Sequence, residues 1–301
     1  EDKHLRPWKK GHYRSPRSLW LANAVAMSVD SDDIGELLQD PDVVDVVPNA
    51  TLSIPPVSYL PASGNGSDGS PTMWNHEQIG LDYLRQQGLD GTGIRIGILD
   101  TGVEVDHPEL QGKLAAWQEF DVLGNAVPSE PHETHAVAHG THVASILVGE
   151  QTGIAPRAAL LCALVLPEGY GTTEQVVSGM QWVLDPDGDP DTDDGVRIVN
   201  MSWGMAGTST VLQAAIESMV AAGVLPVAAI GNSGRNSTFS PGNALGAVGV
   251  GAMNEYDNIA VFSGGGEVCW DGLCINKPDV AAPGVNIYGA AVEGGYQYLS
   301  G

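Results

Sequence analysis

The chain alternates short, wholly apolar runs with stretches whose apolar residues recur at helical spacing. Buried strands are predicted over 93–99, 158–166, 196–202, 224–230 and 247–252, and helices over 79–87, 139–148, 174–184 and 210–222. Strands that are apolar throughout need cover on both faces, and helices that alternate with them provide that cover in a parallel sheet. The sequence therefore predicts an α/β domain, a parallel sheet with helices on both faces.

A smaller unit precedes this domain. A strand, a short helix and a second strand are predicted over 19–29, 34–38 and 43–47, which together form a small α+β unit. Residues 55–73 are rich in proline, glycine and serine, a composition typical of a linker that is open to proteolysis. We therefore expect three parts, at 1–54, 55–73 and 74–301.

Three polar residues follow elements of the predicted sheet. Asp100 closes one apolar strand, Asn232 follows another, and His139 begins a helix. Open parallel sheets gather such residues at the carboxyl ends of their strands. A histidine base needs a carboxylate to orient it, and a tetrahedral oxyanion needs a donor such as an amide. A lone aspartate is more often a turn or cap residue, a lone histidine is more often structural, and Asn-Ser-Gly is usually a turn. The prediction of acyl-transfer chemistry therefore depends on all three together.

The motifs around these residues resemble those of the subtilisin-like serine protease family. They are Asp100-Thr101-Gly102-Val103, His139-Gly140-Thr141-His142, Asn200-Met201-Ser202-Trp203-Gly204, Ala228-Ala229-Ile230-Gly231-Asn232 and Lys277-Pro278-Asp279. The resemblance covers 74–301 and implies a subtilisin-like fold. It also implies a serine endopeptidase in which Asp100 is the triad carboxylate, His139 the base and Asn232 the oxyanion donor.

The same resemblance implies how a polypeptide substrate is bound. Two strands would pair with an extended chain, Gly169-Tyr170-Gly171 on one side and Ser202-Trp203-Gly204 on the other. Ala228-Ala229-Ile230-Gly231 would wall the pocket for the residue before the scissile bond, where Ile230 replaces the alanine usual in the family. Residues 19–54 resemble the second half of an inhibitor-type propeptide, with an unrelated appendage as the alternative. The chain's own propeptide is thus an expected partner, with a processing site in the linker.

The serine of the family has no counterpart within the sequence. Leu299-Ser300-Gly301 matches the residues before it, so the nucleophile is expected two positions beyond Gly301. We favour an N-terminal zymogen fragment of a longer protease, whose C-terminal continuation carries the serine. A deliberately inactivated protein and a non-catalytic, peptide-binding pseudoprotease are alternatives. A binder would have no need of Asp100, His139 and Asn232. An inhibitor of the propeptide type is a further class.

Composition limits the partners. The net charge of -24 argues against nucleic acid and anionic membranes, and no apolar run is long enough to predict a membrane span. Cys269 and Cys274 are spaced for a small disulfide loop, which is compatible with the secretion that we expect, and Cys162 lies in an apolar run.

No cofactor is expected to be required. The acidic run 185–194 could hold a structural calcium ion, with a solvated loop as the favoured interpretation. A calcium site at Glu109, implied by the resemblance, is disfavoured because the loop after the 139–148 helix is short.

Overall fold

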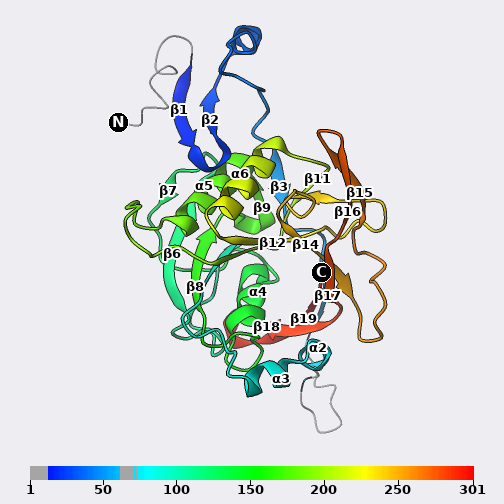
Figure 1. Cartoon of the computed structure of the whole chain (residues 1–301). Helices are drawn as coiled ribbons and strands as arrows, with labels where there is room; N and C mark the ends of the chain where they lie inside the picture. Colours follow the sequence, from blue (N-terminus) through cyan, green and yellow to red (C-terminus); the bar gives the residue numbers. More distant parts are fainter. Residues whose placement is uncertain (1–12, 62–70, 72) are drawn as a thin grey trace.

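The computed structural model describes residues 13–61, 71 and 73–301 (Figure 1). Its largest sheet has the strand order β17-β14-β12-β10-β5-β8-β6-β7. All neighbouring strands in it are parallel except β6 and β7. The strands are β5 (Arg95–Asp100), β6 (Leu114–Phe120), β7 (Ala126–Val127), β8 (Ala159–Leu164), β10 (Ile198–Met201), β12 (Leu225–Ala229), β14 (Val248–Met253) and β17 (Val280–Pro283).

Helices cover both faces of this sheet, as the sequence predicts. Side chains alternate along β5, so Ile98 belongs to the apolar cluster of α4 (His139–Val148). Leu99 belongs to the opposite cluster, with α5 (Thr173–Leu184) and α6 (Thr210–Ala221). Both Ile98 and Leu99 are fully buried. The parallel α/β fold class is therefore confirmed.

Most element boundaries agree with the sequence to within about three residues. The helix predicted over 79–87 is instead two short helices, α2 (Trp74–Gln78) and α3 (Leu81–Gln86). Gly80 separates them in the left-handed region, with φ of 68°, a conformation that glycine adopts without a steric penalty.

The N-terminal unit differs from its prediction. The strand predicted over 19–29 is a hairpin of β1 (Arg14–Leu19) and β2 (Ala24–Ser28), because Trp20–Ala22 form a 3-10 turn (η3). Asn23 ends that turn in the left-handed region, which asparagine tolerates. Figure 1 shows the hairpin in blue above α5 and α6, and Leu19 and Leu21 of this hairpin join their apolar cluster.

The helix that follows is present, but the next strand is not. After the 3-10 turn η4 (Ser31–Asp33), α1 (Ile34–Leu37) lies where a helix is predicted. The strand predicted over 43–47 is wrong, since these residues lie in no strand and Val44 is fully exposed. Apolar β-branched residues form a strand only where another strand supplies hydrogen bonds, and within the described residues β2 pairs with β1 alone.

The predicted linker contains ordered structure. Residues 58–61 form β4 (Ser58–Pro61), which pairs with β19 (Tyr296–Ser300). On its other side, β19 pairs with β18 (Ile287–Ala290). Further upstream, β3 (Thr51–Ser53) pairs with β9 (Tyr170–Thr172). The rest of the predicted linker, 62–70 and 72, and residues 1–12 of the first part lie outside the described residues.

The remaining elements are short. They are η5 (Pro167–Gly169), η6 (Val292–Gly294), and two antiparallel strand pairs, β11 (Met205–Ala206) with β13 (Phe239–Ser240) and β15 (Gly266–Trp270) with β16 (Leu273–Lys277). A disulfide joins Cys269 to Cys274 across the second pair, as the spacing predicts, and Cys162 is fully buried in β8. Among the described residues, no helix is both long and apolar enough to cross a lipid bilayer.

Candidate active site

Asp100 and His139 meet at the carboxyl edge of the large sheet. Asp100 is the last residue of β5 and His139 the first of α4, and His139 Nδ1 lies 2.7 Å from Asp100 Oδ1. The same oxygen accepts a 2.8 Å hydrogen bond from the backbone N–H of Thr101. Asp100 is 0% and His139 5% exposed, so the pair is shielded from water. Because Nδ1 donates to the carboxylate, Nε2 is the nitrogen that can accept a proton.

Charge in this buried pair favours a protonated imidazole. Burial alone lowers the pKa of His139, but the charge and hydrogen bond of Asp100, with a smaller effect from Glu133, leave that pKa above its ordinary value. Two neighbouring histidines behave differently. Burial and the charge of His139 lower the pKa of His142 to about 4 and also lower the pKa of His135. Of these three histidines, His139 is therefore the one whose pKa its surroundings raise.

Glu133 ties the aspartate turn to the histidine helix, a role that the sequence analysis misses. One carboxylate oxygen accepts from Thr101 Oγ1 at 2.7 Å, and the other accepts from Thr141 N and Oγ1, both at 2.8 Å. Thr101 Oγ1 in turn accepts from Gly140 N at 2.9 Å. The signal in the sequence is an acidic residue shortly before a helix N-terminus, where its charge is favourable.

The backbone of the two elements also touches directly. A methyl group added at Gly140 would lie 2.2 Å from the carbonyl oxygen of Gly102, a separation that no real side chain tolerates. Glycine at the second position of the histidine helix therefore lets the helix approach the aspartate turn closely enough for the His139–Asp100 hydrogen bond.

The two predicted substrate strands lie on either side of a segment from the chain's own N-terminal part. This cleft segment, residues 50–61, runs antiparallel to β9, with Leu52 opposite Gly171 and Ser53 opposite Tyr170. On the other side, Ser53 and Gly204 exchange two backbone hydrogen bonds of 3.0 and 3.2 Å.

Gly169 also binds the cleft segment, since its carbonyl accepts a 3.0 Å hydrogen bond from Ile54 N. Not all predicted strand residues face the segment with their side chains. Trp203 is fully buried, and its indole N–H donates to the Leu99 carbonyl at 2.9 Å. Ser202 Oγ accepts from the Asn200 amide at 3.0 Å. The backbone of these strands, rather than the side chains of Ser202 and Trp203, is therefore what the cleft segment contacts.

Asn232 contacts the cleft segment at a single peptide group. Its side-chain amide donates a 3.1 Å hydrogen bond to the carbonyl oxygen of Pro56. Gly301 is also close, since a methyl group added there would lie 3.3 Å from Asn232 Nδ2 and 3.5 Å from a methyl of Val57. Pro56 is therefore the residue of the cleft segment whose carbonyl the Asn232 amide reaches.

The residues before Asn232, which are predicted to wall a pocket, have a large aromatic neighbour that the prediction does not include. Ala228 and Ile230 are almost fully buried, Ala229 is partly exposed, and Gly231 lies under the ring of Phe239, which the sequence analysis did not select. A methyl group added at Gly231 would lie 2.6 Å from Phe239 Cδ1. Phe239 is therefore a large side chain next to these residues, in addition to Ile230, which the sequence already indicates.

The proposed calcium residues differ in how they fit a cation. Glu109 does not fit, because one of its oxygens accepts from Gln151 N, Thr152 N and Thr152 Oγ1 and the other from Tyr296 hydroxyl, with all four distances between 2.9 and 3.1 Å. Donors therefore already surround this carboxylate. Burial and the hydrogen bond to Glu109 together raise the pKa of Tyr296 to about 12.

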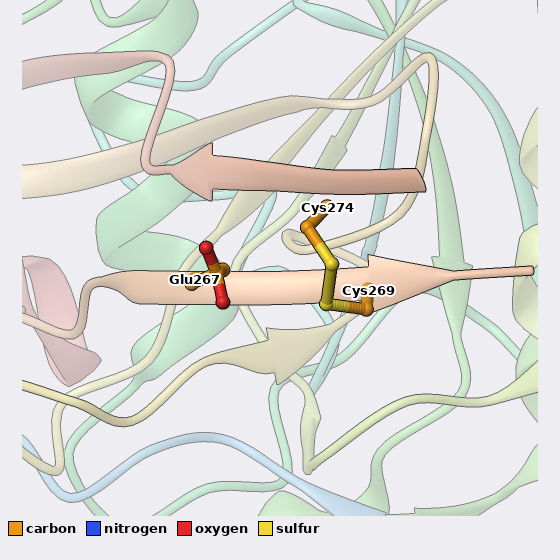
Figure 2. A group of neighbouring side chains, drawn as sticks. All are labelled: Glu267, Cys269 and Cys274. Atoms are coloured by element: carbon orange, nitrogen blue, oxygen red, sulfur yellow. A yellow bond between two sulfur atoms is a disulfide. The ribbon is translucent and has the colours of Figure 1, made fainter. Parts of the chain in front are cut away.

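Two other clusters of side chains bring several atoms of the kind that bind metal ions close together. Asp185, Asp187 and Asp194 bring carboxylate oxygens within 4.8 Å of one another, and these residues of the acidic run could hold a divalent cation. Glu267 lies beside Cys269 and Cys274 (Figure 2), but those cysteines are joined in the disulfide and so offer no thiolate.

An aspartate-oriented histidine and an amide that donates to a peptide carbonyl are the kinds of group that serine peptidases use. The comparisons agree with this class. Residues 91–301 match the Subtilase family. An "Alkaline protease" of Alkalihalobacillus alcalophilus is 30% identical over 256 residues, which are 82% of this chain and 60% of the relative.

Other relatives are similar to the same extent. "Subtilisin-like protease 3" of Pseudogymnoascus destructans is 32% identical over 88% of this chain and 61% of its own length. "Subtilisin BL" of Lederbergia lenta is 32% identical over 76% of this chain and 77% of its own length. The chain spans about 60% of the length of the first relatives. The chain belongs to the subtilase family of serine peptidases.

Proposed function

We propose that this chain is the N-terminal zymogen part of a serine endopeptidase, with residues 1–54 as the propeptide, 55–73 as the linker that contains the processing site and the segment from 74 onward as the protease domain. The observation that carries the proposal is the cleft segment. It pairs with both predicted substrate strands, and its Pro56 carbonyl receives the Asn232 amide. A propeptide held in this way occupies the cleft as a substrate would and excludes other peptides.

The chemistry follows from the positions of the three polar groups. A serine hydroxyl would lose its proton to His139 Nε2 as it attacks the carbonyl carbon, and Asp100 would stabilise the imidazolium that forms. Asn232 would donate to the oxyanion, and His139 would then return the proton to the leaving amine. Catalysis by this route requires no cofactor, and a calcium ion at Asp185, Asp187 and Asp194 would be structural.

The nucleophile itself is proposed to lie two residues beyond Gly301. The position of Gly301 supports this, since it lies beside both Asn232 and Val57. The polypeptide that follows would then deliver its serine next to the Pro56–Val57 bond. Secretion is part of the proposal too, because an acidic chain with an exposed disulfide suits an oxidising compartment.

Hydrolysis of a peptide ester tests the proposal. The protein is expressed together with the polypeptide that follows Gly301 in its gene, and we expect turnover and labelling of one serine by a fluorophosphonate. His139→Ala should lower turnover by about 10⁶-fold, the loss known from subtilisin. A folded protein that binds peptides, is not labelled and has no esterase activity would instead be a non-catalytic peptide-binding module.

A further inference from the structure

The Phe239 side chain lies between two segments of the site. One wall is Ala228–Gly231, directly before Asn232, and the other is Ser202–Gly204. Phe239 begins β13, which pairs with β11 directly after Gly204. A methyl group added at Gly231 would lie 2.6 Å from Phe239 Cδ1 and 2.8 Å from Cγ. One added at Gly204 would lie 3.1 Å from Phe239 Cβ and 3.5 Å from Cδ2. The Phe239 side chain is therefore in contact with one glycine from each wall.

Backbone hydrogen bonds hold Phe239 in this position. Its N–H donates to the Ile230 carbonyl at 3.0 Å, and its carbonyl accepts from Asn243 N at 2.9 Å. Ile230 itself is fixed, because it is 1% exposed and its N–H donates to Val250 at 3.0 Å. Displacing the ring by moving the backbone would break these bonds, so only a rotation of the side chain could open the space.

We infer that Phe239 fills the space between Gly204 and Gly231 beside Asn232, here called the recess. Phe239 thereby restricts the enzyme to substrates with a small, uncharged side chain immediately before the scissile bond. This inference rests on the proposed function. Inserting a large side chain into occupied space forces neighbours off their preferred rotamers. The recess also lacks a charged partner, since Ala228–Gly231, Ser202–Gly204 and Phe239 contain no ionisable side chain. A buried charge without a partner is costly.

The chain's own cleft segment agrees with this preference. Pro56 is the residue whose carbonyl reaches Asn232, and its side chain is exposed rather than buried against the protein. Proline has a compact, uncharged ring and no backbone N–H to satisfy. The residue before the proposed scissile bond in this chain is therefore compact and uncharged, and its ring stays outside the space that Phe239 fills.

A pair of peptide substrates tests the inference. They are otherwise identical and carry either alanine or phenylalanine before the cleaved bond. For the protein expressed with the polypeptide that follows Gly301, we expect kcat/KM to favour alanine by about 100-fold or more. Phe239→Ala should raise kcat/KM for the phenylalanine substrate by about 100-fold, mainly through a lower KM, while the alanine substrate changes less than tenfold.

Controls separate the possible outcomes. Retained cleavage of the alanine substrate shows that Phe239→Ala is folded, and Tyr256→Ala, at an aromatic residue that is 73% exposed, should leave the ratio unchanged. An unaltered protein that cleaves after phenylalanine as well as after alanine, or a ratio that Phe239→Ala does not change, would overturn the inference. Absence of both cleavage and fluorophosphonate labelling would instead contradict the proposed function.

Discussion

The two sides of the cleft differ in how their polar groups are held. On one side, Asp100 and His139 are buried, and the hydrogen bonds that fix them come from the protease body, through Thr101 and Glu133. On the other side, Asn232 is partly exposed and its amide donates to Pro56 of the cleft segment. His139 is therefore oriented by the protease body alone, whereas the partner of the Asn232 amide lies in the cleft segment.

This difference predicts different consequences for substitutions on the two sides. Changes on the histidine side should alter the pH dependence of activity, because they change the charge and orientation of a titrating group. Changes at Asn232 should alter the rate without altering the pH profile, because an amide does not titrate. The following substitutions test this contrast, in order of decreasing expected effect on activity.

Asp100→Asn should have the largest effect of these substitutions. An amide at this position can donate to His139 Nδ1 and so stabilise the wrong tautomer, and we expect kcat to fall by about 10⁴-fold. Steady-state hydrolysis of a peptide ester measures the loss. Asp106→Asn, at an exposed neighbour, is the matched control and should retain full activity. A loss of less than tenfold in Asp100→Asn would show that His139 is not the oriented base.

Asn232→Ala should lower kcat by about 10²–10³-fold with little change in KM, the range known for the oxyanion asparagine of subtilisin. The acidic limb of the pH–rate profile should stay in place. Ser233→Ala, next in the chain and exposed, should behave like the unaltered protein. A shifted pH profile in Asn232→Ala would mean that the two sides of the cleft are coupled rather than independent.

Glu133→Gln should lower kcat by about 10- to 100-fold, because it loosens the link between the Asp100 turn and α4. Activity requires neutral His139 and is lost as pH falls through the pKa of that group, which is raised here. Removing the charge of Glu133 lowers this pKa, so the acidic limb should move to lower pH. Exposed Glu130→Gln should move it less. A limb that is unchanged would restrict Glu133 to a purely structural role.

Glu109→Gln should have the smallest effect on activity, because Glu109 stabilises a region outside the cleft. Glu109 is 1% exposed and accepts four hydrogen bonds, and an amide nitrogen would face donors instead of accepting from them. We expect a loss of about 1–3 kcal/mol in unfolding free energy with kcat unchanged. Thermal denaturation with and without a chelator measures this, and a calcium-dependent Tm in the unaltered protein that this variant abolishes would contradict the hydrogen-bonded assignment.

The sequence predicts the protease body well, because its signals are local. Wholly apolar strands and helical periodicity predict β5, β8, α4 and α5. Asp100 and Asn232 follow or end strands and His139 begins a helix, which predicts that these polar groups lie at one edge of the sheet. These features depend on each element burying its own apolar face, which the sequence displays directly.

The remaining features depend on contacts between distant segments, which the pattern of residues does not display. Val43–Val47 have strand composition but lie in no strand, whereas Ser58–Pro61 lie in a linker composition and pair with β19. Glu133 and Phe239 likewise become functional candidates only once Thr101, Thr141 and Gly231 are brought beside them. Backbone pairing partners and close approaches are set by tertiary structure.

The most direct measurement is the N-terminal sequence of the mature protease, determined together with its intact mass. The protein expressed with the polypeptide that follows Gly301 should be cut between Pro56 and Val57, the bond whose carbonyl receives the Asn232 amide, and should begin at Val57. His139→Ala should remain uncut. A cut at the same bond in His139→Ala, or a mature protein whose first residue lies away from the cleft segment, would contradict a zymogen that processes itself in this cleft.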